Sequence, residues 1–95
     1  MHYVYVLYSL KDQKLYKGST SNIQKRLIRH NSGGSKSTAK RRPFVLVHIE
    51  QFEDKSEAIK REYYLKTLEG GSKLIEFLKK QNILDGESNL NTSQR

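Results

Sequence analysis

The sequence predicts a single small α+β domain, in which short strands and amphipathic helices are joined by polar turns. Three observations predict it. Residues 3–8 alternate between two faces, residues 44–49 form a dense apolar run too short for most helices, and residues 54–66 and 72–83 carry apolar side chains at helical spacing. A chain of 95 residues builds one modest core and leaves no room for a second domain.

The first predicted element is a β-hairpin at the N-terminus. Residues 3–8 are aromatic or β-branched at nearly every position. Alternation places them on two faces of a strand, one with Tyr3, Tyr5 and Leu7 and the other with Val4, Val6 and Tyr8. The polar residues 9–14 form the turn and residues 15–18 form the second arm, so Tyr5 and Tyr16 lie on neighbouring strands.

A helix is predicted directly after the hairpin. Residues 20–22 are all candidate N-caps, and Ser21 with Gln24 fits a capping box. Apolar residues at helical spacing form one stripe of this helix. The rest of its circumference carries Lys25, Arg26, Arg29 and His30. Residues 31–34 end the helix, with glycine available for a left-handed C-cap.

The second half of the chain predicts a buried strand and two helices. The basic segment 35–42, a short helix or a loop, stops at Pro43, and residues 44–49 form the central strand. A capping box over residues 54–57 begins a helix that closes at Gly70-Gly71, and Ser72 caps a further helix. Residues 85–95 are polar apart from one leucine and predict a disordered tail, so the domain spans residues 1–84.

The composition excludes several classes of protein. The chain has no cysteine, which excludes disulfides, thiolate metal sites and thiolate catalysis. It has no apolar run of membrane-spanning length and no basic segment followed by an apolar one at its start. We therefore expect a soluble, cytoplasmic protein with no membrane partner. No feature of the sequence indicates its oligomeric state.

Basic and acidic residues are segregated along the chain, whose formal net charge is +8. The interval between Asp12 and Glu50 holds nine lysines and arginines and no acid, and the other nine acids lie from Glu50 onward. Because a surface of one sign destabilises the folded state through self-repulsion, this segregation indicates a polyanionic partner, most often nucleic acid. A solubilising face is the alternative interpretation. The candidate contacts are Lys17, Lys25, Arg29, Lys36, Lys40, Arg41 and Arg42.

Four motifs, in this order, resemble the GIY-YIG nuclease family, and in particular its small stand-alone bacterial members, from residue 3 to about residue 80. The motifs are Tyr3-Val4-Tyr5, Tyr16-Lys17-Gly18, Arg26 with His30, and Glu62. The step from Tyr5 to Tyr16 is eleven residues and the step to Arg26 is ten. Tyr3 replaces the glycine of the first motif, Lys17 replaces the usual isoleucine or valine, and Ser19 stands where some relatives have a lysine near the phosphate.

This resemblance implies a three-stranded antiparallel sheet flanked by helices, with one catalytic face. It implies a DNA endonuclease in which Glu62 binds the metal, Mg²⁺ or Mn²⁺. The implied catalytic residues are Tyr5, Tyr16, Arg26, His30 and Glu62. With no separate recognition domain, such an enzyme would be directed by DNA structure or by weak sequence preference. A module that binds nucleic acid without cutting it is the alternative function.

The chemistry of phosphodiester hydrolysis asks for these residue types. The reaction needs an activated water, charge relief on the phosphoryl oxygens and help for the leaving oxygen. A cation on Glu62 and the planar guanidinium of Arg26 can provide the charge relief. We assign the base to Tyr5 with Tyr16 as its orienting partner, and expect Arg26, Lys17 and the metal to favour the phenolate.

Each of these residues also has a purely structural interpretation. Tyr5 and Tyr16 could be core aromatics, and Arg26 a solvated helix base. Glu62 could be a surface acid that pairs with Lys66 at i+4. His30 is predicted either to contact a phosphate or water, or to place a charge at the helix C-terminus.

Overall fold

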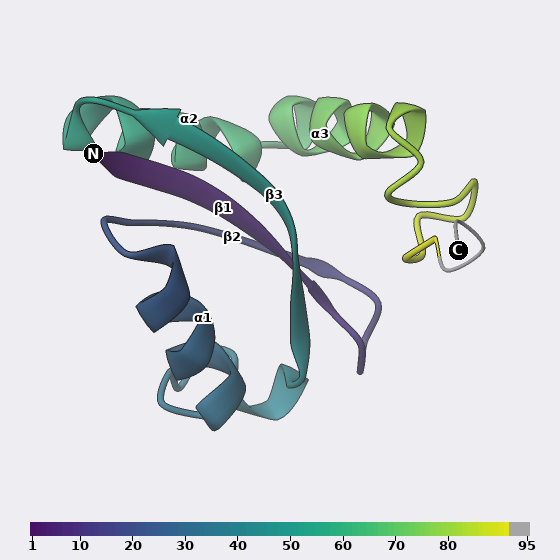
Figure 1. Ribbon diagram of the computed structural model, residues 1–95. Helices are drawn as coiled ribbons and strands as arrows, with labels where there is room; N and C mark the ends of the chain where they lie inside the picture. The colour runs from purple at the N-terminus through teal and green to yellow at the C-terminus, as the bar shows by residue number, and fades with distance from the viewer. Residues whose placement is uncertain (92–95) are drawn as a thin grey trace.

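The computed structural model describes residues 1–91, which form a three-stranded antiparallel sheet with helices on both faces (Figure 1). The strands are β1 (His2–Ser9), β2 (Leu15–Thr20) and β3 (Phe44–Phe52), in the order β2-β1-β3. The helices are α1 (Ile23–Ser32), α2 (Lys55–Leu65) and α3 (Leu68–Lys80), with a short 3₁₀ helix η1 (Ala39–Arg41) before β3. The predicted α+β class with a three-stranded antiparallel sheet flanked by helices is confirmed.

The central strand is β1, and the prediction that residues 44–49 form the central strand is wrong. β1 pairs with β2 on one side and β3 on the other, and its residues 4–9 are all buried. β3 is an edge strand, and Ile49 within it is 45% exposed. Its apolar character reflects helices that cover both faces of the sheet, so a strand can be apolar on both sides without lying between two neighbours.

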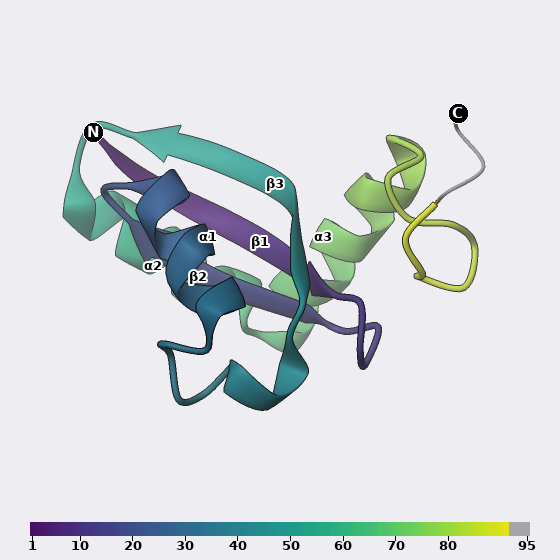
Figure 2. The same cartoon turned by 60° about the horizontal axis from the view of Figure 1, so that its bottom comes forward.

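The two faces of β1 build two separate hydrophobic clusters, as the alternation predicts. Val4, Val6 and Tyr8 pack against residues of α2 and α3. Tyr5 and Leu7 pack with Phe44 and with the apolar stripe of α1. Figures 1 and 2 show the same division, with α2 and α3 on one face of the sheet and α1 on the other.

The first helix begins and ends close to its predicted limits. The N-cap is Asn22, whose side-chain oxygen accepts a hydrogen bond from the Lys25 N–H at 3.0 Å. The predicted capping box with Ser21 is therefore wrong, because Asn22 is the residue that places an acceptor over the helix end. Gly33 is the C-cap with φ of 84°, a left-handed conformation that glycine adopts without strain.

The two glycines predicted to separate the last helices lie inside α3. Thr67 caps this helix by accepting from the Gly70 N–H at 3.0 Å, so Ser72 is not the cap. A side chain at Gly70 would clash with the backbone carbonyl of Tyr64. Glycine therefore permits the close approach of α3 to the end of α2 instead of ending a helix. The expected capping box of α2 is also absent, because the Asp54 side chain makes no capping hydrogen bond.

The chain continues past α3 as an ordered segment up to the last described residue. Leu84 is buried and forms a β-bridge with Leu90, which packs against the core cluster of α2 and α3. Asp85 stabilises the turn between them by accepting from the Glu87 and Asn89 N–H groups. The expected disordered tail from residue 85 is thus corrected up to residue 91, and residues 92–95 lie outside the described part. Within residues 1–91, no helix is long and apolar enough to cross a membrane.

Candidate active site

The two motif tyrosines lie side by side on the face of the sheet that α1 covers. Tyr5 is the cross-strand partner of Gly18, and its ring lies directly over that glycine. A Cβ at position 18 would sit 2.5 Å from the Tyr5 hydroxyl oxygen, so any other residue would displace the tyrosine. The Tyr5 and Tyr16 ring centroids are 6.3 Å apart. The glycine of the second motif therefore makes room for the tyrosine of the first.

His30 is buried against Tyr5, which corrects both predicted roles for this histidine. It is 1% exposed, its Nε2 lies 2.9 Å from the Tyr5 hydroxyl, and its Nδ1 lies 2.8 Å from the Thr38 hydroxyl. Tyr16 meets the imidazole edge-on at 4.9 Å between centroids, and Phe44 lies at 5.9 Å. His30 is therefore neither a solvent-facing helix charge nor free to contact a phosphate directly.

The hydrogen bonds around His30 assign a direction to the Tyr5 proton. The Thr38 hydroxyl donates to the Ser35 carbonyl at 3.5 Å, which leaves its oxygen to accept from Nδ1–H of His30. Nε2 is then unprotonated and accepts from the Tyr5 hydroxyl. Burial lowers the pKa of His30, as do the charges of Arg26 and Arg29, so the imidazole is neutral. In this arrangement the polar hydrogens of Tyr5, His30 and Thr38 each have an acceptor.

Among the protein groups alone, Tyr5 is a neutral phenol, and the expected phenolate, which also depended on the charge of a bound metal, stays a prediction. Burial is the largest effect and raises its pKa to about 12, with a further increase from Tyr16 and a smaller one from Glu62. The Arg26 guanidinium acts in the opposite direction but does not outweigh burial. Lys17 is not among the groups that act on this phenol. Tyr5 can therefore accept a proton only as it passes its own to His30.

Glu62 reaches the same edge of the sheet from the opposite face. Its side chain is 14% exposed and lies beside β2, where the Ser19 hydroxyl donates to Oε1 at 2.8 Å. Lys66 Nζ lies 2.7 Å from Oε2, which is the i+4 pair of the structural interpretation. The carboxylate is close enough to Tyr5 to raise its pKa. Ser19, a departure from the family pattern, thus acts as a hydrogen-bond donor to the predicted metal ligand.

A hard divalent cation fits Glu62 as its single protein ligand. Among residues 1–91, no three His, Cys, Asp or Glu side chains gather to form a closed metal site. Mg²⁺ commonly binds one or two carboxylates and takes its other ligands from water and substrate phosphate. Glu62 offers such an oxygen donor, partly open to solvent, beside a hydroxyl and near a phenol.

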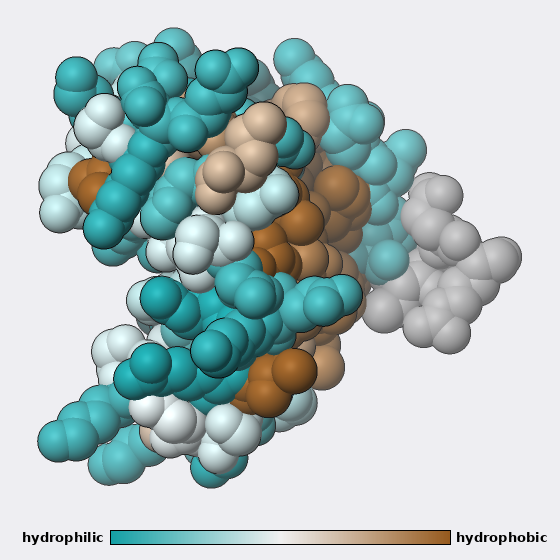
Figure 3. Space-filling view, turned by 60° about the vertical axis from the view of Figure 1, so that its left-hand side comes forward, coloured by the Kyte–Doolittle hydropathy of each residue, from teal (hydrophilic) through white to brown (hydrophobic). Residues whose placement is uncertain are grey.

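The basic residues predicted to contact nucleic acid occupy different places. Lys25 and Arg29 are exposed on α1, and with Arg26 they line a hollow of about 500 Å³ at the start of that helix. Lys36, Lys40 and Arg42 are exposed between α1 and β3. Figure 3 shows two regions of hydrophilic side chains on one face of the molecule, with hydrophobic side chains between them. These residues can reach a bound polyanion.

Arg41 and Lys17 lie apart from this basic set. Arg41 donates to the Asp12 carboxylate at 2.6 Å, and its guanidinium lies 5.6 Å from the centroid of the Phe44 ring. Arg41 is the largest influence on Asp12 and lowers its pKa to about 2. Lys17 is half-buried on the face with α2 and α3, opposite Tyr5, and its pKa is lowered by burial and by Lys66. Arg41 is therefore paired within the fold, and Lys17 faces away from the motif tyrosines.

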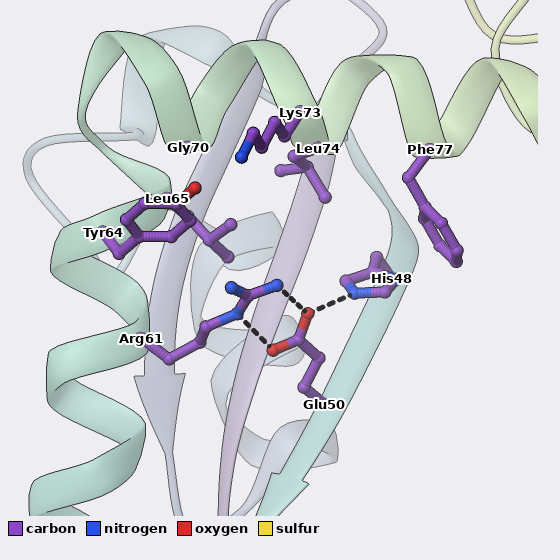
Figure 4. A pocket seen from close by; sticks show the side chains of 9 residues that line it. All are labelled: His48, Glu50, Arg61, Tyr64, Leu65, Gly70, Lys73, Leu74 and Phe77. Atoms are coloured by element: carbon purple, nitrogen blue, oxygen red, sulfur yellow. Dashed lines mark hydrogen bonds and ion pairs between the residues drawn. The ribbon is translucent and has the colours of Figure 1, made fainter.

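A second hollow, of about 210 Å³, lies at the other edge of the sheet between β3 and the last two helices (Figure 4). Its floor is a polar network in which Arg61 donates to both oxygens of Glu50 and His48 lies 2.9 Å from the same carboxylate. These groups satisfy one another and join β3 to α2. None of the residues that the motifs select lies in this hollow.

The site combines two tyrosines on adjacent antiparallel strands, an arginine and a buried histidine on the next helix, and a glutamate on the helix after β3. This combination defines a GIY-YIG type of catalytic domain. The GIY-YIG catalytic domain family matches residues 1–74, and the chain belongs to this family.

Similar proteins share this region. A UPF0213 protein of Staphylococcus haemolyticus is 50% identical over 74 residues, which are 77% of this chain and 89% of the relative. A UPF0213 protein of Clostridium perfringens is 51% identical over 75 residues, or 78% of this chain and 80% of the relative. The solution NMR structure of a UPF0213 protein from Bacillus halodurans has a TM-score of 0.50 and 38% identity, with 80% of this chain and 83% of that chain covered.

Proposed function

We propose that this protein is a divalent-metal-dependent endonuclease that hydrolyses phosphodiester bonds in DNA, directed by DNA structure or weak sequence preference. The observation that carries the proposal is the buried contact of 2.9 Å between the Tyr5 hydroxyl and His30 Nε2. A structural tyrosine needs only one hydrogen-bond partner. Here the partner is a neutral imidazole with its other nitrogen held by Thr38, which is the arrangement of a base and its orienting group.

Substrate binding falls to the basic side of α1. Arg26 lies near the Tyr5 phenol and has the planar donor fork that grips a phosphate. Lys25 and Arg29 flank it on the exposed surface of the helix. The scissile group would then lie between Arg26 and the phenol.

The proton transfer uses Tyr5 and His30 in sequence. As a water attacks phosphorus, its proton passes to the Tyr5 oxygen while the phenolic proton passes to His30 Nε2. One oxygen–hydrogen bond of water breaks, a phosphorus–oxygen bond forms, and the bond to the leaving sugar oxygen breaks. The leaving oxygen takes a proton from solvent, and the proton held by His30 returns to Tyr5 as the phenol releases one to solvent, which restores the starting state. This relay removes the need for a stable phenolate at a pKa of about 12.

Tyr16 and Glu62 complete the proposed site. Tyr16 packs edge-on against His30 and fixes the plane of the imidazole. Glu62, held by Ser19, would bind Mg²⁺ or Mn²⁺. When bound, that cation would neutralise charge on the phosphoryl oxygens and stabilise the leaving oxygen.

A plasmid-nicking assay with Mg²⁺, Mn²⁺ or chelator tests the proposal through Tyr5→Phe. This variant keeps the ring over Gly18 but removes the hydroxyl that bonds to His30. We expect nicking to fall by about a hundredfold, the scale of a lost general base. Tyr8→Phe is the matched control, because its hydroxyl lies on the opposite face of the same strand and bonds to Asn89. Parental nicking by Tyr5→Phe would contradict the assigned role.

A non-catalytic nucleic-acid-binding module is the second candidate function. The observation that favours it is that both oxygens of Glu62 already have partners within the protein, Ser19 and Lys66. Such a module would bind DNA but leave plasmid intact with either metal. The same assay therefore separates the two functions.

A further inference from the structure

We propose that Lys66 is a positioning residue of the metal site, which holds the Glu62 carboxylate in place and competes with the divalent cation for it. This inference rests on the proposed function, because it concerns the same glutamate. It concerns a residue that none of the four motifs selects. The two residues lie one helical turn apart, at the end of α2.

The geometry of this ion pair differs from that of the other i+4 pairs in the described residues. Lys66 Nζ lies 2.7 Å from Glu62 Oε2, whereas the Lys73–Glu69 and Lys80–Glu76 pairs measure 3.4 Å and 4.0 Å. The Glu62 side chain is 14% exposed, against 69% for Glu69 and 72% for Glu76. Solvent therefore screens the Glu62 pair less, and its charges interact more strongly.

Both oxygens of Glu62 are occupied in this arrangement. Ser19 donates to Oε1 at 2.8 Å, and the Lys66 ammonium holds Oε2. A cation that binds the carboxylate must displace the ammonium or share an oxygen with it. The Lys66 side chain is 47% exposed, so its head can move into solvent while its stem stays packed. Lys66 would then weaken metal binding without preventing it.

A second lysine acts in the same direction. The Lys17 ammonium lies over Gly71, half-buried, and the charge of Lys66 contributes to lowering its pKa. A divalent cation at Glu62 would add positive charge to a region that already holds two ammonium groups. Direct competition and repulsion therefore both predict tighter metal binding when Lys66 loses its charge.

Titration calorimetry with Mn²⁺, on the full chain without DNA, tests the inference. We expect the dissociation constant for Mn²⁺ to fall by about threefold to tenfold in Lys66→Met, the scale of a partly buried ion pair that no longer has to break. Lys66→Arg keeps the charge and should stay within about twofold of the parent. Lys73→Met is the matched control, because it removes one lysine from another i+4 pair and changes the net charge equally.

Each remaining outcome counts against the inference. Equal affinity in Lys66→Met and the parent, with binding lost in Glu62→Gln, would overturn the role of Lys66 and leave the proposed function intact. An equal gain in Lys66→Met and Lys73→Met would show a general effect of net charge instead. No Mn²⁺ binding by the parent or by Lys66→Met would overturn both the inference and the assignment of Glu62 as metal ligand.

Discussion

The Tyr5 hydroxyl lies 2.9 Å from Nε2 of His30, and both side chains are buried between the sheet and α1. The two residues are separated by 25 positions and come from different elements. The contact requires the absence of a side chain at Gly18, a helix capped by Asn22, and a hydrogen bond between Thr38 and the far nitrogen of the imidazole. Several parts of the fold thus hold the phenol and the imidazole in contact.

The first prediction concerns the pH dependence of stability, which follows from His30. Its pKa is lowered in the folded protein, so below the ordinary value of about 6.5 the unfolded chain binds a proton that the folded chain does not. The free energy of unfolding should therefore fall as the pH drops from about 7 to 5. Urea unfolding at several pH values should show a flatter profile for His30→Gln than for the parent.

The pH profile of nicking should also depend on His30, on its acid side. Because the relay requires neutral His30, activity should fall only when the pH drops below its lowered pKa. The acid limb should therefore lie below the ordinary histidine value of about 6.5. A limb above that value would contradict the proposed proton acceptor.

The second prediction concerns Gly18→Ala. The added methyl group would lie 2.5 Å from the Tyr5 hydroxyl oxygen, so the ring must move and its contact with His30 must lengthen. We expect a loss of about 1–3 kcal/mol in the free energy of unfolding, typical of overpacking, and a larger loss of nicking than of DNA binding. Gly86→Ala is the matched control, because no heavy atom lies within 4 Å of a Cβ there. Equal effects of the two substitutions would contradict this account of Gly18.

The third prediction separates phosphate contacts from structural arginines. The logarithm of DNA affinity should fall linearly with the logarithm of salt concentration, with a slope of about 0.9 for each phosphate contact on duplex DNA. The double variant Lys25→Ala/Arg29→Ala removes two exposed bases of α1 and should reduce that slope by about two contacts. Arg41→Ala should leave the slope unchanged and lower stability, because it breaks the ion pair with Asp12. A flat salt response of the parent would contradict electrostatic DNA binding.

The sequence predicts local features of this fold well where only one arrangement buries the apolar side chains. The alternation of residues 3–8 assigns each side chain to a face, because a shift by one residue would expose an entire apolar set. The sequence did not predict that β3 is an edge strand or that Gly70 lies inside α3. Both depend on which element passes beside another, and local pattern carries no information about that.

The structure brings the motif residues of the candidate site together, whereas the residues that contact them were not found from the sequence. The motif residues Tyr5, Tyr16 and Arg26 lie near one another, and Glu62 approaches them from α2. Thr38 and Ser19 acquire their contacts only from the fold, and Ser19 contacts a residue 43 positions away. Thr38 lies in a segment whose sequence indicates only basic charge, and Ser19 was noted only as a departure from the family motif. One signal was available for Lys66, its i+4 spacing from Glu62.

The last prediction is that Glu62→Gln gives a folded, DNA-binding and inactive protein. Glutamine keeps the size and helix propensity of glutamate and can still accept from Ser19, but it removes the charge that a hard cation needs. We expect nicking to fall by about a hundredfold or more, and the stabilisation by Mn²⁺ in a thermal melt to disappear. The free energy of unfolding without metal should change by less than about 1 kcal/mol, because one partly exposed ion pair is lost. DNA affinity should stay equal or rise, since a negative charge beside the phosphate is gone.

Glu69→Gln is the control for Glu62→Gln, because Glu69 also pairs with a lysine at i+4 but lies exposed on α3. It should leave nicking, metal stabilisation and DNA affinity at parental values. If Glu62 were only a surface acid, the two variants would behave alike and both would nick at the parental rate. A difference confined to Glu62→Gln, seen in metal stabilisation as well as in nicking, would place the cation at this carboxylate and separate a catalytic role from general charge balance.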